Sequence, residues 1–463
     1  MILRHTQSLC PVCLRRLDAV YECTGTVVLL RKECPDHGTF SVPVWQNTLV
    51  DFSAWVRDKI PSYPEHPVTE AQNGCPFDCG LCPEHGQHTC TGLLEVTKRC
   101  TLHCPVCYAQ AGANSEQKDP DSTDLARRLT VLRKLSGPCN VQISGGEPTV
   151  REDLPEIVRL AATFGFGLLQ LNTNGLRLAA EEGYAQTLRE AGLDSVYLQW
   201  DGVSEMAFET LRGRPLLREK MQALEDCARA GLGVVLVATV VKGVNDSGLG
   251  DLLRFAVRAG PCVRGLHIQP AAFFGRYPWP LACAPRMTLP EVIEALVRQA
   301  PELISLSDVH PPCCEHALCS FSAVYTRNGA GGLTVLPQKG GCCTEEQIVA
   351  AEGAAVSRRF TAMHWKGVAR EHLFDPNAAQ SSTAAFDRFL ARAGIAQRFT
   401  LSAMAFQDAL SVDIARVRGC CIHVIRDDGR LLPFCLHNMT AMETDDRGAA
   451  ESAECGLRLY PET

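Results

Sequence analysis

The sequence contains no apolar run that approaches the roughly 20 residues of a membrane helix. Its N-terminus lacks the apolar core of a signal peptide, so we expect a cytoplasmic protein without a transmembrane segment. The net charge is −7, with lysine and arginine scattered along the chain, which argues against nucleic acid as a partner. These absences leave an ordinary globular protein, and the length of 463 residues predicts two or three domains.

Cysteine is what the chain has in excess, with 24 residues, of which eleven fall within residues 1–107. In a long chain without a signal peptide, cysteines are metal ligands more often than disulfide partners. Several metal sites are therefore expected, and oxygen-sensitive clusters among them would fit a reducing compartment.

The most informative cysteines have the spacing Cys-x3-Cys-x2-Cys, with an aromatic residue directly after the third: Cys100, Cys104, Cys107 and Tyr108. Three thiolates are one too few to close a [4Fe–4S] cluster, whose irons normally each take one cysteine. The remaining iron is an open coordination position, as in catalytic metal sites. Three cysteines by themselves fit half of a zinc site equally well.

A second motif, Gly145-Gly146-Glu147-Pro148, ends a strand-like apolar run further along the chain. Its glycines permit close approach of the backbone to a ligand. The triplet followed by this motif resembles the signature of the radical S-adenosylmethionine (SAM) superfamily. The resemblance implies that SAM chelates the open iron and is cleaved to a 5′-deoxyadenosyl radical, with Cys100, Cys104 and Cys107 as the catalytic cysteines. It also implies that the second motif contacts SAM, with Glu147 as a buried structural acid.

Short apolar strands alternate with amphipathic helices from residue 91 to about 300, which predicts βαβ units and a parallel sheet. The expected strands are Leu93–Val96, Asn140–Ser144, Gly167–Asn172, Ser195–Trp200, Gly233–Val241 and Gly265–Gln269. The expected helices include Asp124–Leu135, Leu154–Thr163, Glu182–Ala191 and Leu216–Ala230. Six such units make a partial (β/α)6 barrel, the α/β fold of this superfamily, in which the chemistry lies at the carboxyl ends of the strands.

Polar side chains end the third to sixth strands, where the ribose and the methionine carboxylate of SAM are expected: Asn172, Asp201, Thr239 and Gln269. Helix capping or turn formation explains Asn174-Gly175 and Asp201-Gly202 equally well. Arg212 and Lys220 follow the fourth strand and fit either an anion site or a solvated helix start.

Two knuckles near the N-terminus, Cys10-Pro11-Val12-Cys13 and Cys34-Pro35-Asp36-His37, predict one tetrahedral metal with three thiolates and an imidazole. The metal is zinc or a single rubredoxin-like iron. Because a closed four-ligand site leaves no room for substrate, we expect a structural role. Cys23 is the alternative to His37 as fourth ligand.

A second Cys-x3-Cys-x2-Cys triplet precedes every expected barrel strand, so we assign it to an auxiliary [4Fe–4S] cluster rather than to catalysis. Its ligands are Cys75, Cys79 and Cys82, with Cys90 as the fourth. A second auxiliary cluster is expected on dispersed cysteines: Cys314, Cys319, Cys421 and Cys435. The doublets Cys313-Cys314 and Cys420-Cys421 leave individual ligands open there, and the remaining cysteines are expected to be small buried hydrophobes.

Four parts of the chain follow from these patterns: a metal module (1–68), an auxiliary-cluster segment (69–90), the barrel (91–300) and a C-terminal α+β auxiliary-cluster module that covers the substrate (301–463). The first should contain a short helix and a connector within Val42–Val68. In the last we expect a helix around Thr344–Ala355, Ala- and Ser-rich helices from 378 to 416, and a β-hairpin from Cys421 to Cys435 turned by Asp428-Gly429. Substrate is expected at the carboxyl mouth of the barrel, between it and this module.

The order of the cysteine groups resembles one family, which contains archaeal tetraether lipid synthase and the class D radical SAM methylases that act on a pterin precursor. The matching runs are Cys-Pro-Val-Cys-Leu, Cys-Pro-Asp-His-Gly, Gly-Cys-Pro-Phe-Asp-Cys-Gly-Leu-Cys-Pro-Glu-His and Cys-Pro-Val-Cys-Tyr-Ala. The resemblance covers about residues 8–275, Pro312–Cys319 and Cys420–Asn438, and it implies a rubredoxin-like site, the radical SAM cluster and auxiliary clusters. Thr101 stands where the family usually has Asn, and the stretch 342–410 matches no part of the family.

The family implies hydrogen abstraction followed by C–C bond formation or methylation on a lipid or a small molecule, as a transferase or oxidoreductase with ferredoxin or flavodoxin as reductant. A lipid would need a long apolar groove, and peripheral membrane contact, whereas a pterin needs a few aimed polar groups. The patch Ala271-Ala272-Phe273-Phe274 fits either. The alternative is a peptide- or protein-modifying radical SAM maturase. A pure electron-transfer or metal-storage protein would have no use for the Gly-Gly-Glu-Pro motif.

Overall fold

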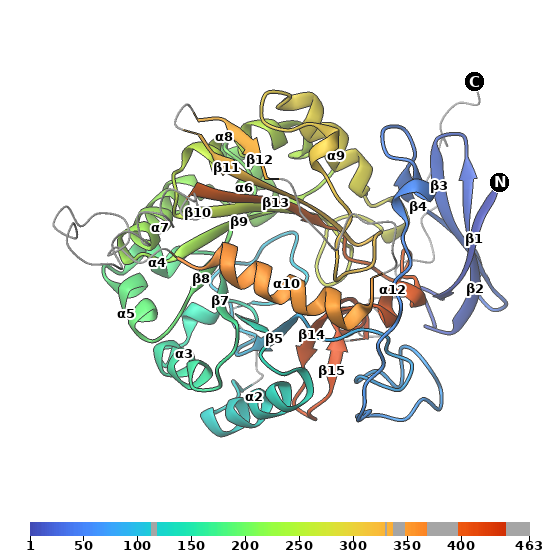
Figure 1. The fold of residues 1–463 in the computed structure, drawn as a ribbon, viewed down its shortest axis with the longest axis horizontal. Helices are drawn as coiled ribbons and strands as arrows, with labels where there is room; N and C mark the ends of the chain where they lie inside the picture. The colour runs from blue at the N-terminus through green and yellow to red at the C-terminus, as the bar shows by residue number, and fades with distance from the viewer. Residues whose placement is uncertain (113–117, 329–330, 337–347, 368–396, 441–463) are drawn as a thin grey trace.

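A sheet of 11 strands forms the body of the protein, and a separate four-stranded sheet carries the N-terminus (Figure 1). The computed structural model describes residues 1–112, 118–328, 331–336, 348–367 and 397–440. Within these ranges no helix is both long and apolar enough to cross a membrane.

The six central strands are parallel and confirm the predicted barrel sheet. They are β5 (Thr91–Glu95), β6 (Asn140–Ser144), β7 (Leu168–Thr173), β8 (Ser195–Gln199), β9 (Gly233–Val240) and β10 (Val263–Pro270). Their helices are α2 (Ser122–Ser136), α3 (Leu154–Ala162), α4 (Leu176–Ala180), α5 (Tyr184–Glu190), α6 (Glu205–Arg212), α7 (Leu217–Ala230), α8 (Leu249–Arg258) and α9 (Leu289–Gln299). Nearly every residue of β9 is buried, as expected of a parallel strand whose outer face is covered by helices.

Residues after 300 extend this same sheet at both edges, so the predicted boundary at residue 300 does not separate two sheets. At one edge, β13 (Arg398–Met404) pairs in parallel with β10, followed by β11 (Ser320–Arg327) and β12 (Leu333–Val335). At the other edge, β14 (Ile422–Ile425) pairs in parallel with β5, and β15 (Leu431–Pro433) completes the predicted hairpin.

The prediction of helices from 378 to 416 is partly wrong. Within the described part of this range the chain forms the strand β13 and the start of the short helix α12 (Ile414–Arg418), and 378–396 lie outside the described residues. The burial of most of β13 follows from its position between β10 and β11, a contact between distant segments that local composition does not encode.

Helix α10 (Ala350–Trp365) contacts β9, β10 and β13 and crosses in front of the barrel in Figure 1. The predicted helix at 344–355 therefore begins later, within the described residues, and runs further. Gly353 brings α10 against a cysteine loop, because a Cβ at this position would lie 2.3 Å from the backbone oxygen of Cys313. The final described helix is α13 (Phe434–Thr440).

The N-terminal sheet has the order β1-β2-β3-β4, formed by Ile2–Leu9, Arg16–Thr24, Val27–Cys34 and Gly38–Gln46, all antiparallel. The expected short helix is α1 (Phe52–Trp55), whose two aromatic residues pack against Trp45. Lys32 and Tyr21 fasten this sheet to the chain before α12: Lys32 Nζ donates to the carbonyls of Ala409 and Leu410, and the Tyr21 hydroxyl to Asp413.

Candidate active site and metal centres

A cavity of about 660 Å³ occupies the inside of the barrel. Its wall combines residues of the strands β5–β10 with residues of β11, β13, α10 and Phe434 of α13. Its volume lies within the roughly 300–1,000 Å³ of small-molecule sites. The residues after 300 thus close the barrel cavity, which is the arrangement expected for the substrate site.

Cys100, Cys104 and Cys107 line this cavity on the loop that follows β5. Arg276 holds the loop in place: its Nη1 donates to the carbonyl of Cys104 over 2.9 Å, and its backbone N–H donates to that of Cys107 over 2.8 Å. Burial raises the pKa of the Cys100 thiol to about 12. A bound metal overcomes this cost, because its charge favours the thiolate. Sequence reasoning missed Arg276.

The glycines of Gly145-Gly146 allow the loop after β6 to pack on the cysteine loop. Gly145 has φ +137°, and a Cβ there would lie 2.2 Å from the Thr97 carbonyl oxygen, while one on Gly146 would lie 2.3 Å from that of Arg99. The Gly146 N–H donates to Thr97 O over 2.8 Å. These glycines therefore set the position of the cysteine loop as well as lining the cavity.

Glu147 has the contacts expected of a buried structural acid. It is 1% exposed, and its Oε1 accepts hydrogen bonds from Thr149 and from the Thr173 hydroxyl. Its Oε2 accepts from the Asn174 backbone N–H over 2.6 Å. Asn174 in turn donates from Nδ2 to the Thr101 hydroxyl, so the residue that departs from the family pattern joins the network. Glu147 still lines the cavity, whereas Pro148 does not.

Asp201 lies outside the cavity lining, which corrects the expectation that it faces SAM. Its buried carboxylate is occupied by Arg212, whose Nε and Nη2 donate over 2.6 and 2.7 Å, and by the Thr239 backbone N–H. Arg212 lines the cavity in its place. Its other bonds run to the Val106 carbonyl and the Thr239 hydroxyl, and its guanidinium also interacts with the Cys104 thiol.

Lys220 is fully buried, which excludes the solvated helix start considered from sequence. Its Nζ donates to the Asn174 carbonyl and, over 3.2 Å, to the side chain of Gln199. Burial lowers the pKa of Lys220 to about 8, an effect that the Asp201 charge partly offsets. The hydrogen bond from Lys220 to Asn174 holds the turn that follows β7.

Arg212→Ala is expected to destabilise the protein by about 3–5 kcal/mol, because it leaves the Asp201 carboxylate buried without its partner. The matched control is Arg214→Ala, since Arg214 pairs with Glu219 at the surface, where its side chain is 49% exposed, and should cost less than about 1 kcal/mol. Urea unfolding of both variants measures the difference. Equal losses of unfolding free energy in the two variants would show that the buried pair stabilises the protein no more than the surface pair does.

The remaining predicted SAM residues, Tyr108, Asn172, Thr239 and Gln269, all line the cavity. Asn172 donates from Nδ2 to Ser144 and Gln142 over 3.4 Å, and its Oδ1 has no hydrogen-bond partner among the described residues. An unpaired buried acceptor in a cavity wall fits a site that is completed by a ligand donor. The three cavity-lining thiols, the glycine loop and this acceptor are together compatible with a cluster that carries SAM.

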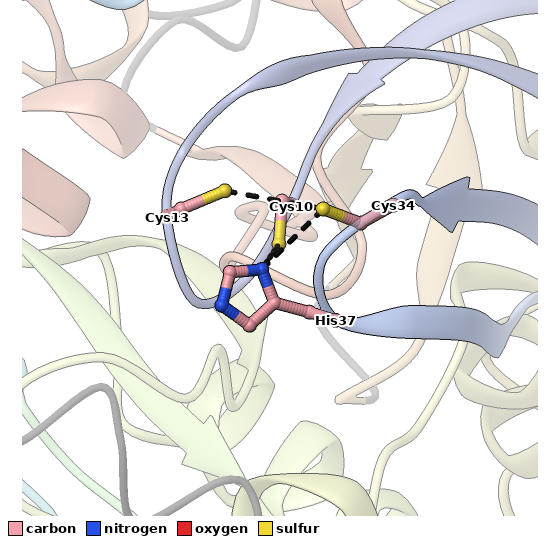
Figure 2. A group of neighbouring side chains, drawn as sticks. All are labelled: Cys10, Cys13, Cys34 and His37. Carbon is pink, nitrogen blue, oxygen red and sulfur yellow. Dashed lines mark hydrogen bonds between the residues drawn. The ribbon is translucent and has the colours of Figure 1, made fainter.

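The N-terminal knuckles form a compact ligand group of Cys10, Cys13, Cys34 and His37 (Figure 2). The sulfurs of Cys13 and Cys34 are 4.0 Å apart, and His37 Nδ1 lies 3.6 Å from the Cys10 sulfur and 3.4 Å from that of Cys34. Ligands about 2.0–2.3 Å from a shared tetrahedral ion lie roughly 3.5–3.8 Å apart, which matches these distances. Cys23 is directed to the Gly25 carbonyl instead.

The structure corrects the predicted grouping of the auxiliary cysteines. Cys90 lies with Cys314 and Cys421, not with the triplet of Cys75, Cys79 and Cys82. The sulfurs of Cys90 and Cys314 touch, but their Cα atoms are 7.6 Å apart, beyond the roughly 4.4–6.8 Å of protein disulfides, so a bridging metal centre fits the backbones better. The cause is the β5–β14 pairing, in which the Cys90 N–H donates to the Cys421 carbonyl.

The other two expected C-terminal ligands lie elsewhere. Cys435 belongs to the same buried cluster as Cys75 and Cys79, and its thiol interacts with that of Cys319. The sulfur of Cys319 accepts a hydrogen bond from Arg416 Nε over 3.3 Å. Among the described residues the structure therefore supports one of the two expected auxiliary groups with a changed membership, in which Cys90 joins Cys314 and Cys421.

A parallel barrel with a cysteine triplet after its first strand and Gly-Gly-Glu-Pro after its second defines the chain as a radical SAM enzyme. Residues 94–256 match the model of the radical SAM superfamily, and residues 2–46 match that of the HMPTM N-terminal zinc ribbon domain. The chain is 33% identical to the 7,8-dihydro-6-hydroxymethylpterin dimethyltransferase of Methanocaldococcus jannaschii, over 94% of this chain and 93% of that protein. It belongs to the family of this dimethyltransferase, within the class D radical SAM methylases.

Other similarities are confined to part of the chain. A probable GTP 3′,8-cyclase of Pyrococcus abyssi is 29% identical over 38% of this chain and 56% of the cyclase. Streptococcus suis SuiB bound to S-adenosylmethionine superimposes with a TM-score of 0.37 at 13% identity, over 46% of this chain and 48% of SuiB.

Proposed function

We propose that this enzyme methylates a small heteroaromatic substrate of the dihydropterin class, with a one-carbon donor other than the SAM that is cleaved to the radical as the source of the methyl group. The observation that carries the proposal is the full-length similarity to a 7,8-dihydro-6-hydroxymethylpterin dimethyltransferase. The cavity is compatible with it, because a few polar side chains such as Tyr197, His267, Gln269 and Ser402 are set in a wall that is mostly apolar.

In this proposal Cys100, Cys104 and Cys107 hold a [4Fe–4S] cluster, which together with SAM supplies one-electron cleavage to a 5′-deoxyadenosyl radical. The residues of the protein would bind SAM and the substrate and orient them toward each other. The Arg212 guanidinium, whose plane Asp201 fixes, would place its positive charge beside the SAM carboxylate and the Cys104 thiolate. Asn172, Thr239 and Gln269 are the other proposed contacts. The strands and α10 surround the cavity and would shield its contents from water, and ferredoxin or flavodoxin is the proposed reductant.

The other metal centres are proposed to support this site. The N-terminal group is proposed to hold zinc as a structural ion, in agreement with the zinc ribbon match of residues 2–46. One auxiliary [4Fe–4S] cluster is assigned to Cys75, Cys79 and Cys82 with Cys435 beside them, and a second to Cys90, Cys314 and Cys421.

The proposal predicts that a dihydropterin stimulates 5′-deoxyadenosine formation by the reduced, cluster-loaded enzyme. With the reacting carbon of the substrate deuterated, deuterium should appear in 5′-deoxyadenosine, since the radical takes that hydrogen. Mass spectrometry of both products is the measurement, with archaeal lipid vesicles and a peptide pool as parallel additions. Stimulation by lipid or peptide but not by dihydropterin would overturn the proposal in favour of C–C coupling or peptide modification.

A further inference from the structure

The wall of the cavity contains a group of three aromatic rings. Tyr197 of β8, His267 of β10 and Trp365 at the end of α10 come from three distant parts of the chain. The ring centroids of Tyr197 and His267 are 5.6 Å apart, those of Tyr197 and Trp365 5.9 Å, and those of His267 and Trp365 6.5 Å. We call these residues the aromatic triad.

His267 and Trp365 lie deeper in the barrel than the residues proposed to contact SAM, whereas Tyr197 lies beside Asn172, its partner in the β7–β8 register. His267 precedes Gln269 by two residues on the same strand, and side chains two apart point to the same face. Two residues of parallel strand span roughly 7 Å, so His267 and Gln269 lie at successive levels of the same wall. The order from the mouth inward is the cysteine loop, then the proposed SAM contacts with Tyr197 beside them, then His267 and Trp365.

The hydrogen-bonding partners of the triad are neutral, while Arg398, which also lines the cavity, bonds to His364 beside Trp365. Burial lowers the pKa of His267 to about 4, so its ring is neutral at physiological pH. Its Nδ1 is 2.8 Å from the Ser402 hydroxyl, and within the described ranges its Nε2 has no hydrogen-bond partner. The Tyr197 hydroxyl accepts from Gln269 Nε2 over 3.4 Å and keeps its own proton to donate. Trp365 Nε1 donates to the Thr400 hydroxyl over 3.0 Å, which fixes the indole.

We infer that the aromatic triad is the subsite for the ring system of the methylated substrate, a flat and uncharged heteroaromatic bicycle. Aromatic faces bind such a ring by stacking, and unpaired neutral donors and acceptors read its ring nitrogens and amide edge. A substrate that lacked these polar atoms would leave His267 Nε2 unpaired in a buried site, which gives strong discrimination. Trp365 is then a specificity-determining residue supplied by the segment after 300. This inference rests on the proposed function.

Removal of the Trp365 ring is expected to weaken dihydropterin binding roughly 10- to 100-fold, the range for loss of one base–aromatic stack. Trp365→Ala should lose more affinity for the dihydropterin than Trp365→Phe, which keeps an aromatic ring. The matched control is Trp200→Phe, because Trp200 is fully buried, stacks on Phe255 and does not line the cavity. Anaerobic titration calorimetry gives the dissociation constants for substrate and for SAM on each cluster-loaded variant.

His267 offers a second measurement that a folding defect does not mimic. His267→Gln keeps a donor and acceptor near the Nε2 position and should bind more tightly than His267→Phe, although phenylalanine keeps the ring. The subsite is overturned if Trp365→Ala and Trp200→Phe bind substrate alike. It is also overturned if the Trp365 variants lose SAM affinity as much as substrate affinity, because the triad would then hold the adenine of SAM.

A different pattern of ligand binding is expected if the proposed function is wrong. If the wild type binds no dihydropterin, the same variants are titrated with guanine, lumazine and a flavin ring. Binding of one of these that falls in Trp365→Ala keeps the subsite and rejects the dihydropterin. Failure of the wild type to bind any of them rejects both.

Discussion

Simultaneous replacement of Cys100, Cys104 and Cys107 by alanine is expected to abolish SAM cleavage. The three thiols line the barrel cavity on the loop after β5, next to the Gly145-Gly146 loop. With their thiolates removed, no protein ligand holds the cluster irons. The reconstituted wild type should carry three [4Fe–4S] clusters and one mononuclear metal, and the variant should lose about four irons. Anaerobic iron and sulfide analysis with quantification of 5′-deoxyadenosine measures both effects.

Two controls separate loss of this cluster from general damage. Alanine at Cys75, Cys79 and Cys82 should remove a different cluster and leave SAM cleavage detectable. Alanine at Cys227, which is fully buried and lies outside every cysteine group described above, should change neither iron content nor cleavage. If the first triple variant still formed 5′-deoxyadenosine, the catalytic site would have to move to the triplet at Cys75.

The barrel could be predicted because its strands carry their signal locally. β6 matches its predicted bounds at both ends, since an apolar run bounded by turn residues marks a buried parallel strand. The N-terminal strands were not predicted, because they alternate buried and exposed residues over a sheet whose other face is open, as β2 shows. Cysteines, prolines and glycines there obscured the period of two.

The auxiliary cysteines show what sequence spacing cannot encode. Spacing along the chain groups Cys90 with the nearest triplet. In the fold Cys90 directly precedes β5 and Cys421 directly precedes β14, and the two cysteines meet because these strands pair in parallel. Pairing between segments more than 300 residues apart decides such a site, and no local motif reports it. The prediction that Asp201 contacts SAM is wrong for a similar reason. Its partner Arg212 lies at the end of the next helix, and only the folded chain brings the guanidinium to the carboxylate.

Cys34→Ser is expected to release the N-terminal metal and to lower the stability of the protein while SAM cleavage persists in the soluble fraction. Metal binding to such knuckles is folding free energy, on the order of 10 kcal/mol or more in small zinc modules. The loss should reach the body of the protein, because Lys32 on β3 and Tyr21 on β2 bind residues 409–413, which continue into the short helix before Cys420 and Cys421. Thermal unfolding with metal analysis measures the change.

The matched control is Cys23→Ser, which lies on the same sheet with its thiol directed to the Gly25 carbonyl and outside the ligand group. It should keep the metal and unfold within about 0.5 kcal/mol of wild type, as surface substitutions usually do. Metal loss from Cys23→Ser but not from His37→Ala would make Cys23 the fourth ligand. A soluble Cys34→Ser protein that held a full radical SAM cluster but cleaved no SAM would contradict a structural role, because a closed four-ligand site has no position for substrate and acts only through the fold it holds together.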